Sequence, residues 1–386
     1  MRALRDTLQP SMPMSFVKSF LPLLTTLAAG VTTLTVTAFS GLTLRAAPLV
    51  DTHPPLLAQN QSLTPVKFTL SWLLQGVDAP LTTAIEKGYF AEEGLQVTFE
   101  RGFGSADSIG KIAAGQYDLG FGDPYSMIEF NEKNPDQKLI TIAVPYNKAP
   151  FTIISLKKSG INSPADLAGK KLGAPAGDAP RRLWPVFASQ TGVPVDGVEW
   201  ITMEAKLRET FLLQGQVDAI SGFVYSALPS LIKGGAGVED LNIFYYTDNG
   251  LDFYGNSVIT RVDYAQKNPE VLKKFLKAYI RGIQDTIRDP AAGLATVLKA
   301  DTGGLMQEAD EKLRLQLVLD RLLINPEVEA NGLATVDPVR FQKSIEQTVQ
   351  GFGLASQPPL EAVFDDSFLP PKEERLLPPA SERQSL

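Results

Sequence analysis

Two stretches of the chain follow the same pattern and constrain the fold more than any other feature. Residues 112–123 read IAAGQYDLGFGD, and residues 212–223 read LLQGQVDAISGF. In each stretch the apolar end of a predicted helix meets a glycine, Gly115 or Gly215, that can take the left-handed conformation closing a helix. A polar turn and a short apolar strand follow. The repeat predicts a helix–turn–strand unit used twice, and therefore an α/β protein with two lobes.

The polar residues of the repeat are predicted to form turns. Asp118 and Asp218, with the preceding Gln116 and Gln216, are more typical of turns than of ligand sites, because Asp readily bonds its own backbone there. Ligands of open α/β sheets lie outside the carboxyl ends of strands. Residues 122–125 and 221–225 should therefore face each other across a cleft, with one mouth on each lobe.

Composition excludes several classes of function. The chain has 386 residues, 44% of them hydrophobic, which is enough for one or two cores. A net charge of −7 gives no support for nucleic-acid binding. There is no Cys, and His53 in a Pro-rich leader is the only His. Disulfides, thiol catalysis, a Ser-His-Asp triad and His- or Cys-based metal sites are therefore not expected, and neither is a cofactor.

The N-terminal residues 1–65 are predicted to direct export and not to join the fold. Arg2, Arg5 and Lys18 precede an apolar run over residues 20–44, which indicates a signal peptide. Residues 38–40 are a plausible cleavage site. A retained membrane anchor is the competing interpretation, since the run is long enough to span a bilayer. Either way, the folded part is expected outside the cytoplasm.

The remaining chain divides into four predicted segments. Residues 66–150 form the first part of lobe one, 151–256 form lobe two, and 257–355 return to lobe one as mainly helical chain. The helices of this third segment are expected simply to cover lobe one. The Pro-, Glu- and Ser-rich residues 356–386 are predicted to be a flexible tail.

A Gly-Ser bend over residues 102–108 is a good place for a polar ligand, because it starts a helix whose first N–H groups are unpaired. It is not a phosphate loop, since neither the Lys-Ser/Thr ending nor the full dinucleotide fingerprint is present. In the second half, Asp178 and Pro180 form a similar helix start after a predicted strand.

Several of these motifs resemble a known family. Trp72 after the first strand, residues 85–95 (IEKGYFAEEGL), residues 104–106 (GSA) and residues 114–120 (AGQYDLG) are similar to periplasmic substrate-binding proteins of ABC importers. The branch includes binders of thiamine pyrimidine precursors, of aliphatic sulfonates such as taurine, and of nitrate. The resemblance covers residues 66–300 and says nothing about which ligand is bound.

The resemblance implies a type II periplasmic binding protein fold. Each lobe would be a mixed sheet flanked by helices, with two hinge crossings and the helical C-terminal region on lobe one. It also implies a small-molecule ligand, an ABC importer permease as partner and a periplasmic location. We expect a monomer that meets the membrane only through the permease or an uncleaved N-terminal segment, and that binds its ligand without catalysis.

Candidate ligand-binding residues are those at strand ends and helix starts: Trp72, Gln75, Asp78, Gly104, Ser105, Ala106, Asp123, Tyr125, Asp178, Arg181, Glu204, Phe223, Tyr225, Asp248, Asp252 and Tyr254. The aromatic members offer flat stacking faces. The many carboxylates favour an amino-bearing heterocycle, such as a thiamine-type pyrimidine, over an oxyanion, because burying an anion among carboxylates is costly.

Three alternatives stay open. Arg181, Arg182 and the helix starts could hold a sulfonate or nitrate instead. Fungal relatives in the branch synthesise the thiamine pyrimidine with a pocket His and a Cys-rich motif, neither of which this chain has. A sensor domain would require a C-terminal signalling module, and none follows Gly351.

Overall fold

The computed structural model describes residues 62–386. The predicted signal peptide, its cleavage site and most of the predicted linker lie outside the described residues. Within residues 62–386, none of the helices combines the length and the apolar character needed to cross a membrane.

The first sheet has five strands in the order β2-β1-β3-β10-β4. They are β1 (Thr64–Thr69), β2 (Leu95–Glu100), β3 (Leu119–Gly122), β4 (Leu139–Ala143) and β10 (Ser257–Arg261). β1 runs parallel to β2 and β3, whereas β10 runs antiparallel to β3 and β4. The carboxyl ends of β1, β3 and β4 therefore share one edge with the amino end of β10.

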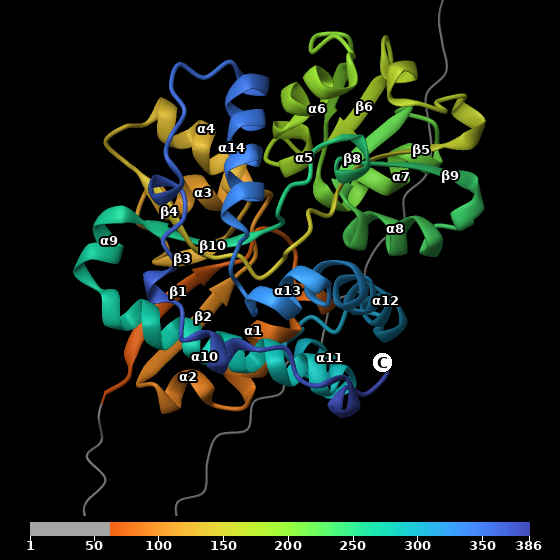
Figure 1. The fold of residues 1–386 in the computed structure, drawn as a ribbon. Coiled ribbons are helices and arrows are strands. Elements are labelled where there is room, and N and C mark those ends of the chain that lie inside the picture. Colours follow the sequence, from red (N-terminus) through yellow and green to blue (C-terminus); the bar gives the residue numbers. More distant parts are fainter. Residues whose placement is uncertain (1–61) are drawn as a thin grey trace, which may run out of the picture. The chain divides into compact units, whose positions relative to one another are not determined.

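The second sheet has the same plan, in the order β7-β6-β8-β5-β9. Its strands are β5 (Phe151–Leu156), β6 (Lys171–Ala174), β7 (Glu199–Thr202), β8 (Ala219–Phe223) and β9 (Leu241–Tyr245). β6 runs parallel to β7 and β8, and β5 runs antiparallel to β8 and β9. The predicted pair of mixed sheets is thus confirmed, one in each lobe (Figure 1).

The repeated motif ends a helix in the same way in both lobes. Gly115 and Gly215 have φ values of 72° and 70°, in the left-handed region. The N–H groups of Gln116 and Gln216 bond back to carbonyl oxygens of the preceding helix at 3.0 and 2.9 Å. These bonds satisfy carbonyl groups that a helix end leaves free. The predicted helix–turn–strand unit therefore occurs twice.

From the sequence, the aspartates of the motif were expected to bond within their own turn. Their carboxylates bond instead to a neighbouring strand. The Asp118 carboxylate accepts the N–H of Lys67 in β1 at 2.8 Å. Asp218 accepts the N–H of Lys171 in β6, also at 2.8 Å. Each aspartate also donates its own N–H to the same lysine's carbonyl oxygen. The motif thus fixes the register between β1 and β3 in the first sheet and between β6 and β8 in the second.

Helices flank both sheets. Lobe one contains α1 (Ala79–Glu86), α2 (Tyr89–Glu92), α3 (Ser105–Ala113) and α4 (Pro124–Lys133). Lobe two contains α5 (Ala179–Arg182), α6 (Trp184–Thr191), α7 (Arg208–Leu213) and α8 (Val224–Lys233). The chain after β10 forms α9 (Val262–Lys267), α10 (Pro269–Arg288), α11 (Pro290–Ala300), α12 (Glu308–Val318), a short π-helix (Leu319–Leu323), α13 (Pro326–Asn331) and α14 (Pro338–Phe352).

The longest helix, α10, packs its apolar face on lobe one as predicted. Leu272, Phe275 and Tyr279 are buried, and the Phe275 ring stacks on Phe68 of β1 at 5.6 Å between centroids. Gly282 lets α10 approach α1 closely, since a Cβ there would lie 2.2 Å from the carbonyl oxygen of Pro80. The C-terminal helices do more than cover lobe one, however, because α12 contacts α8 and α14 contacts α6 of lobe two.

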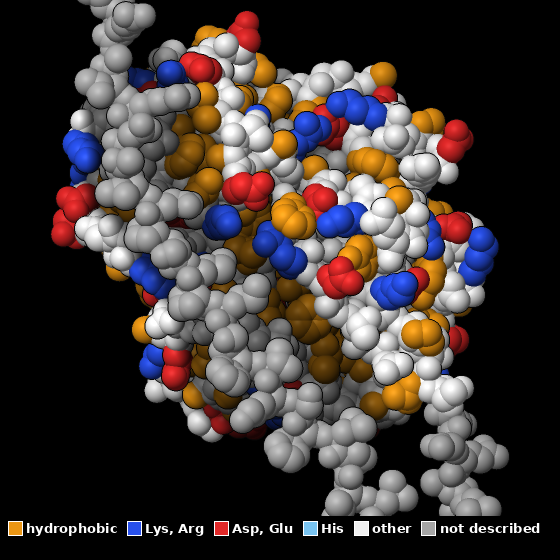
Figure 2. Space-filling view, turned by 180° about the vertical axis from the view of Figure 1, so that it is seen from behind, with side chains coloured by type: hydrophobic (Ala, Val, Ile, Leu, Met, Phe, Trp, Pro, Cys, Tyr) orange, Lys and Arg blue, Asp and Glu red, His pale blue; other side chains and the backbone are white. Residues whose placement is uncertain are grey.

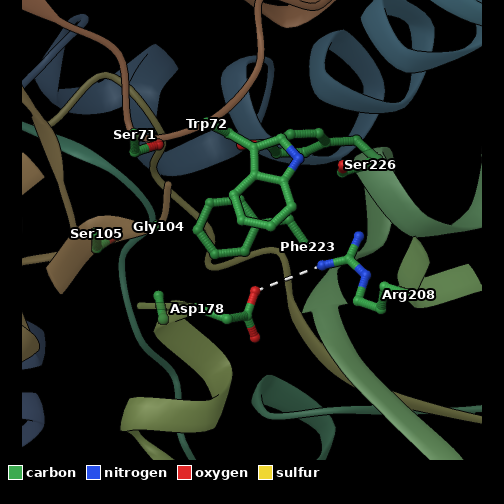
Figure 3. Close-up of a pocket in the computed structure, with 10 residues that line it drawn as sticks. Ser71, Trp72, Gly104, Ser105, Asp178, Arg208, Phe223 and Ser226 are labelled. Carbon is green, nitrogen blue, oxygen red and sulfur yellow. Dashed lines mark hydrogen bonds and ion pairs between the residues drawn. The ribbon is translucent and has the colours of Figure 1, made fainter. Parts of the chain in front are cut away.

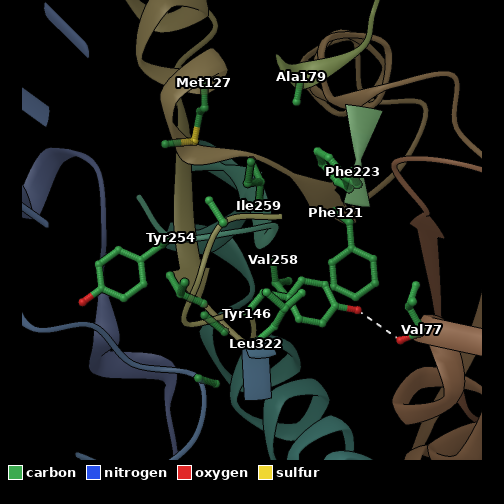
Figure 4. Close-up of a cluster of buried hydrophobic side chains, with 14 of the residues drawn as sticks. Val77, Phe121, Met127, Tyr146, Ala179, Phe223, Tyr254, Val258, Ile259 and Leu322 are labelled. Atoms are coloured by element: carbon green, nitrogen blue, oxygen red, sulfur yellow. Dashed lines mark hydrogen bonds between the residues drawn. The ribbon is translucent and has the colours of Figure 1, made fainter. Parts of the chain in front are cut away.

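Two crossing segments connect the lobes, residues 144–150 and 246–256. They bond to each other: the Gly255 N–H donates to the Tyr146 carbonyl at 2.8 Å, and the Ala149 N–H donates to the Phe253 carbonyl at 2.9 Å. Beside them, the Tyr146 hydroxyl donates to the Val77 carbonyl at 3.1 Å (Figure 4). The crossings therefore run together through the buried core between the two sheets.

The C-terminal residues 356–386 are not the flexible tail that their composition predicts. Thr141, in the edge strand β4, donates its N–H to the Val363 carbonyl and accepts the Asp365 N–H, both at 3.0 Å. Val363 and Phe368 are buried. The segment covers the open edge of the first sheet, so its order comes from tertiary contacts that a composition-based prediction does not consider.

Candidate functional site

A small cavity lies between the lobes at the strand edges where the sequence predicted a cleft. Its empty volume is about 290 Å³. Lobe one contributes Ser71, Trp72, Gly104 and Ser105, and lobe two contributes Asp178, Ala179, Arg208, Phe223, Tyr225 and Ser226 (Figure 3). These residues follow β1, start α3, follow β6, start α7 and join β8 to α8. The free space inside it is about 20 Å³, about the room for one water molecule, so the walls must move apart to admit a larger compound.

The Gly-Ser bend forms the lobe-one wall and touches lobe two directly. Gly104 has a φ of 112°, and a Cβ on it would lie 2.0 Å from the carbonyl oxygen of Gly177. That same oxygen accepts the N–H of Ala106 at 3.3 Å. The start of α3 was predicted to bind a ligand through its free N–H groups. One of them, the N–H of Ala106, bonds instead to lobe two.

A buried ion pair forms the polar floor of the cavity. Arg208, with 2% of its side chain exposed, places Nη1 3.5 Å from Oδ1 of Asp178 and Nη2 2.6 Å from Glu209. Asp178 also accepts a hydrogen bond from the Ser221 hydroxyl at 2.5 Å. Gly222 leaves room for the guanidinium, since a Cβ there would lie 2.6 Å from Nη1. The single cation is thus shared by two carboxylates.

Burial and the guanidinium act in opposite directions on Asp178. Burial raises the pKa of its carboxyl group, and the Arg208 charge and the Ser221 hydrogen bond pull the pKa back down. Asp178 also accepts the backbone N–H of Arg181 as the N-cap of α5. These contacts hold the carboxylate in one orientation beside the cavity.

Aromatic rings supply the flat walls. The Trp72 indole lies over the guanidinium of Arg208, with the Arg208 Cζ 5.2 Å from the ring centroid. Phe223 and Tyr225 meet edge to face, with centroids 5.5 Å apart. Trp72 comes from lobe one and the other two rings from lobe two. A planar ligand could therefore contact aromatic faces of both lobes.

Many of the predicted residues meet at this place. Trp72, Gly104, Ser105, Asp178, Phe223 and Tyr225 line the cavity, and Gln75 and Asp78 line an adjoining one. Sequence reasoning missed Ser71, Ala179, Arg208 and Ser226. Arg208 starts α7 shortly after β7 ends, and this strand-exit position was the available signal for it.

Other predicted residues have structural partners away from the cavity. Asp123 caps α4 by accepting the Ser126 N–H at 2.8 Å. The Tyr125 ring stacks on Phe253 with centroids 4.0 Å apart, and its hydroxyl accepts the Tyr254 N–H. The Tyr254 hydroxyl itself donates to Glu327 at 2.6 Å. None of these three predicted residues is among those lining the cavity within the described chain.

The remaining predicted residues lie at the surface of lobe two or in a crossing. Arg181 donates to the Ala174 carbonyl at 2.8 Å and to Thr202 at 3.0 Å. Glu204, Asp248 and Asp252 are exposed, and Asp252 pairs with Lys148 at 2.8 Å. The sequence could not separate such solvated charges from buried ones, because all of them follow strands.

Charges of both signs are interspersed on the face shown in Figure 2, so no basic patch gathers there. Residues 62–386 contain no group of three or more His, Cys, Asp or Glu side chains placed to hold a metal ion. Among the residues that line the cavity, the charged ones are Asp178 and Arg208.

Comparison with known proteins identifies relatives over most of the chain. Residues 76–293 match the family described as NMT1/THI5 like. The formylaminopyrimidine-binding protein of Halalkalibacterium halodurans is 26% identical, over 69% of this chain and 80% of that protein. The riboflavin-binding protein RibY of Chloroflexus aurantiacus is 23% identical, over 87% of this chain and 95% of that protein.

One enzyme and one solved structure complete the comparison. The 4-amino-5-hydroxymethyl-2-methylpyrimidine phosphate synthase of Aspergillus parasiticus is 25% identical, over 59% of this chain and 68% of that protein. The alkanesulfonate-binding protein SsuA of Xanthomonas axonopodis pv. citri, solved with MOPS bound, superposes with a TM-score of 0.60 at 15% identity. That superposition covers 78% of this chain and 98% of the other.

Proposed function

The chain belongs to the NMT1/THI5-like family, and from this premise we propose that it delivers a small polar molecule to an ABC importer as an extracytoplasmic solute-binding protein. It has the two-lobe fold of periplasmic binding proteins. Relatives named for binding formylaminopyrimidine and riboflavin support a binding role. The proposal includes export through the N-terminal segment, a permease as partner and a monomeric state.

The observation that carries the proposal is a cavity with walls from both lobes. A ligand held between Trp72 of lobe one and Asp178 of lobe two gains contacts on both sides only when the lobes are together. Such a ligand shifts the balance between open and closed arrangements toward the closed one. We propose the crossing segments 144–150 and 246–256 as the hinges of this movement.

For the ligand we propose an amino-bearing planar heterocycle, such as a thiamine-type pyrimidine. The Asp178 carboxylate can accept hydrogen bonds from amino or ring N–H groups, and the aromatic walls can stack on the ring. An oxyanion is the second candidate, which the solved alkanesulfonate-binding relative favours. Against it, Arg208 already faces both Asp178 and Glu209, so an anion would meet a cation that is neutralised.

A synthase role is the candidate from another class, and the Aspergillus relative is the observation that favours it. The cavity walls of the described chain include neither His nor Cys. A reaction there would have to use Asp178, Arg208 or Tyr225 for proton transfer. Asp178 and Arg208 are engaged with each other, which suits holding a ligand better than moving protons.

Native mass spectrometry of the purified protein tests the proposed function. We expect a bound small molecule that is released unaltered, or binding of one of 4-amino-5-hydroxymethyl-2-methylpyrimidine, riboflavin, taurine and nitrate in calorimetry. Small-angle scattering should show a smaller radius of gyration with ligand. Conversion of the bound compound, or no binding of any kind, would reject the proposal.

The Trp72→Ala variant tests whether this cavity is the place of binding. Because the indole covers the cavity from lobe one, its loss should weaken binding of whichever ligand is found by at least about tenfold. Trp72 is only half-buried, so the thermal midpoint without ligand should change little. Unchanged affinity would remove the cavity from the proposal.

A further inference from the structure

A second, inner cavity adjoins the binding cavity on the side of lobe one. The free space inside it is about 10 Å³, about the room that one water molecule or one amino group takes. It shares Ser71, Trp72 and Tyr225 with the binding cavity, and it is closed further in by Phe121 and Tyr146. We refer to it as the inner compartment. The amino group of a ring held between the lobes could reach into it.

Two buried amide side chains line the inner compartment, and each has an unused oxygen. Gln75 is 5% exposed and Asn256 is 2% exposed. Among the residues that the structure describes, Gln75 Oε1 and Asn256 Oδ1 have no hydrogen-bond partner. A buried polar atom left without a partner costs about 1–3 kcal/mol, so two at one cavity call for an explanation.

The nitrogen atoms of both amides are already committed. Gln75 Nε2 donates to the Ser226 hydroxyl at 3.1 Å, and Asn256 Nδ2 donates to the Ser71 hydroxyl at 2.6 Å. Both serines also line the binding cavity. With both amide nitrogens bonded to serines, the two amide oxygens are the atoms left over.

A carboxyl group completes the set. Asp78 lines the inner compartment and is buried, and its Oδ2 accepts the backbone N–H of Gln75 at 2.9 Å. In the aromatic wall, the Tyr146 hydroxyl donates to the Val77 carbonyl at 3.1 Å. Among the side-chain atoms that line this compartment, the two amide oxygens are thus the fully buried ones left without a partner.

We propose that the inner compartment is a subsite for the N–H donor edge of a planar heterocycle, with Gln75 Oε1 and Asn256 Oδ1 accepting from an amino group or ring N–H. This inference rests on the proposed function and specifies which edge of the ligand is recognised. An oxyanion would face the two amide oxygens, which cannot donate a hydrogen bond to it. A ring without N–H donors would leave both amide oxygens buried without partners.

A matched pair of probes tests the subsite by isothermal titration calorimetry. The first is 4-amino-5-hydroxymethyl-2-methylpyrimidine, and the second carries a methyl group in place of the 4-amino group. Wild-type protein should bind the amino compound at least about tenfold more tightly, because the methyl compound satisfies neither oxygen. Asn256→Leu should lose most of this preference by weakening only the amino compound.

Two further variants guard against effects on folding. Gln75→Leu should reduce the same preference, and it serves if Asn256→Leu does not fold. Gln116→Leu is the matched control, since it removes an exposed amide at the opposite end of β3 and should leave both affinities unchanged. Thermal unfolding of each variant without ligand checks that the fold is intact.

Three results would overturn the inference: equal affinity of wild-type protein for the two probes, an unchanged preference in the Asn256 and Gln75 variants, or no binding of the amino compound. None of these results alone rejects the proposed solute-binding function. That function would still stand if native mass spectrometry found another bound molecule.

Discussion

Two buried aspartates near the cavity differ because of what faces them. Asp178 has the Arg208 guanidinium and the Ser221 hydroxyl as partners. Asp78 accepts a backbone N–H and lies in the field of Glu311, and burial raises the pKa of Asp78 to about 7. Burial raises the pKa of both carboxyl groups, but only that of Asp178 is opposed by a neighbouring cation.

The Asp78→Asn variant should reveal this as a pH-dependent stability. The folded-state pKa of about 7 lies above 3.8, the ordinary value of an aspartate, so Asp78 favours the folded state below pH 3.8 and this contribution is lost as pH rises to 7. Wild-type protein should therefore lose up to about 4 kcal/mol relative to Asp78→Asn between pH 4 and 8. Urea unfolding of both proteins across this range provides the measurement, and parallel curves would contradict the assignment.

At the scale of elements, α12 of lobe one clamps the start of α8 in lobe two. Pro229 lies inside α8 and has no N–H to give to the Tyr225 carbonyl four residues earlier. Arg314 donates to that carbonyl at 3.0 Å and to the Ser226 carbonyl at 2.6 Å. Glu311 holds Arg314 at 3.2 Å and also accepts the Gly76 N–H at 2.6 Å. Because Pro229 cannot donate to it, the Tyr225 carbonyl in α8 is free to accept a hydrogen bond from Arg314 in α12.

A double-mutant cycle tests this clamp. Arg314→Leu should destabilise the protein by about 3–5 kcal/mol, because it leaves Glu311 buried without its cation and the Tyr225 carbonyl without a donor. The double variant Glu311→Leu with Arg314→Leu should be less destabilised than the sum of the single changes. Urea unfolding measures all four proteins. Additive effects would mean that the two side chains act independently.

The C-terminal segment acts as the cover of an edge strand. Removing residues 357–386 exposes β4 and takes away the buried Val363, Phe364 and Phe368. Each such side chain contributes about 1.5–3 kcal/mol when buried, so the thermal midpoint should fall by several degrees and aggregation should increase. Differential scanning calorimetry with light scattering measures both effects. Equal midpoints for the truncated and the full-length protein would contradict the covering role.

At the scale of the whole molecule, the sequence predicts the two-lobe fold better than it predicts the residues that line the cavity. The repeated Gly-Gln-x-Asp pattern is local and recurs, so it was enough to predict the paired sheets. Arg208 was missed because a charged residue in a polar helix start looks like a solvated one, and only the fold brings Asp178 to it. Composition likewise could not indicate that Phe368 in a Pro-rich tail is buried.

Gly177 of lobe two lies against Phe103 of lobe one, and this contact allows closure of the lobes to be tested. A Cβ added to Gly177 would lie 2.8 Å from the Phe103 carbonyl oxygen of the other lobe, closer than real Cβ contacts come. Gly177→Ala should therefore penalise the closed arrangement and spare each lobe, since an open arrangement has room for the methyl group. Affinity for whichever ligand is identified should fall by at least about tenfold.

The matched control is Gly110→Ala in α3, where an added Cβ meets nothing within 4 Å. Calorimetry should show an unchanged affinity for it, and small-angle scattering should show the same contraction with ligand as in wild-type protein. Gly177→Ala should contract less at equal ligand concentration, with a similar thermal midpoint in the absence of ligand. If Gly177→Ala binds and contracts like the control, the contact between Gly177 and Phe103 does not form when the lobes close. The cavity would then not be sealed at this contact when ligand binds.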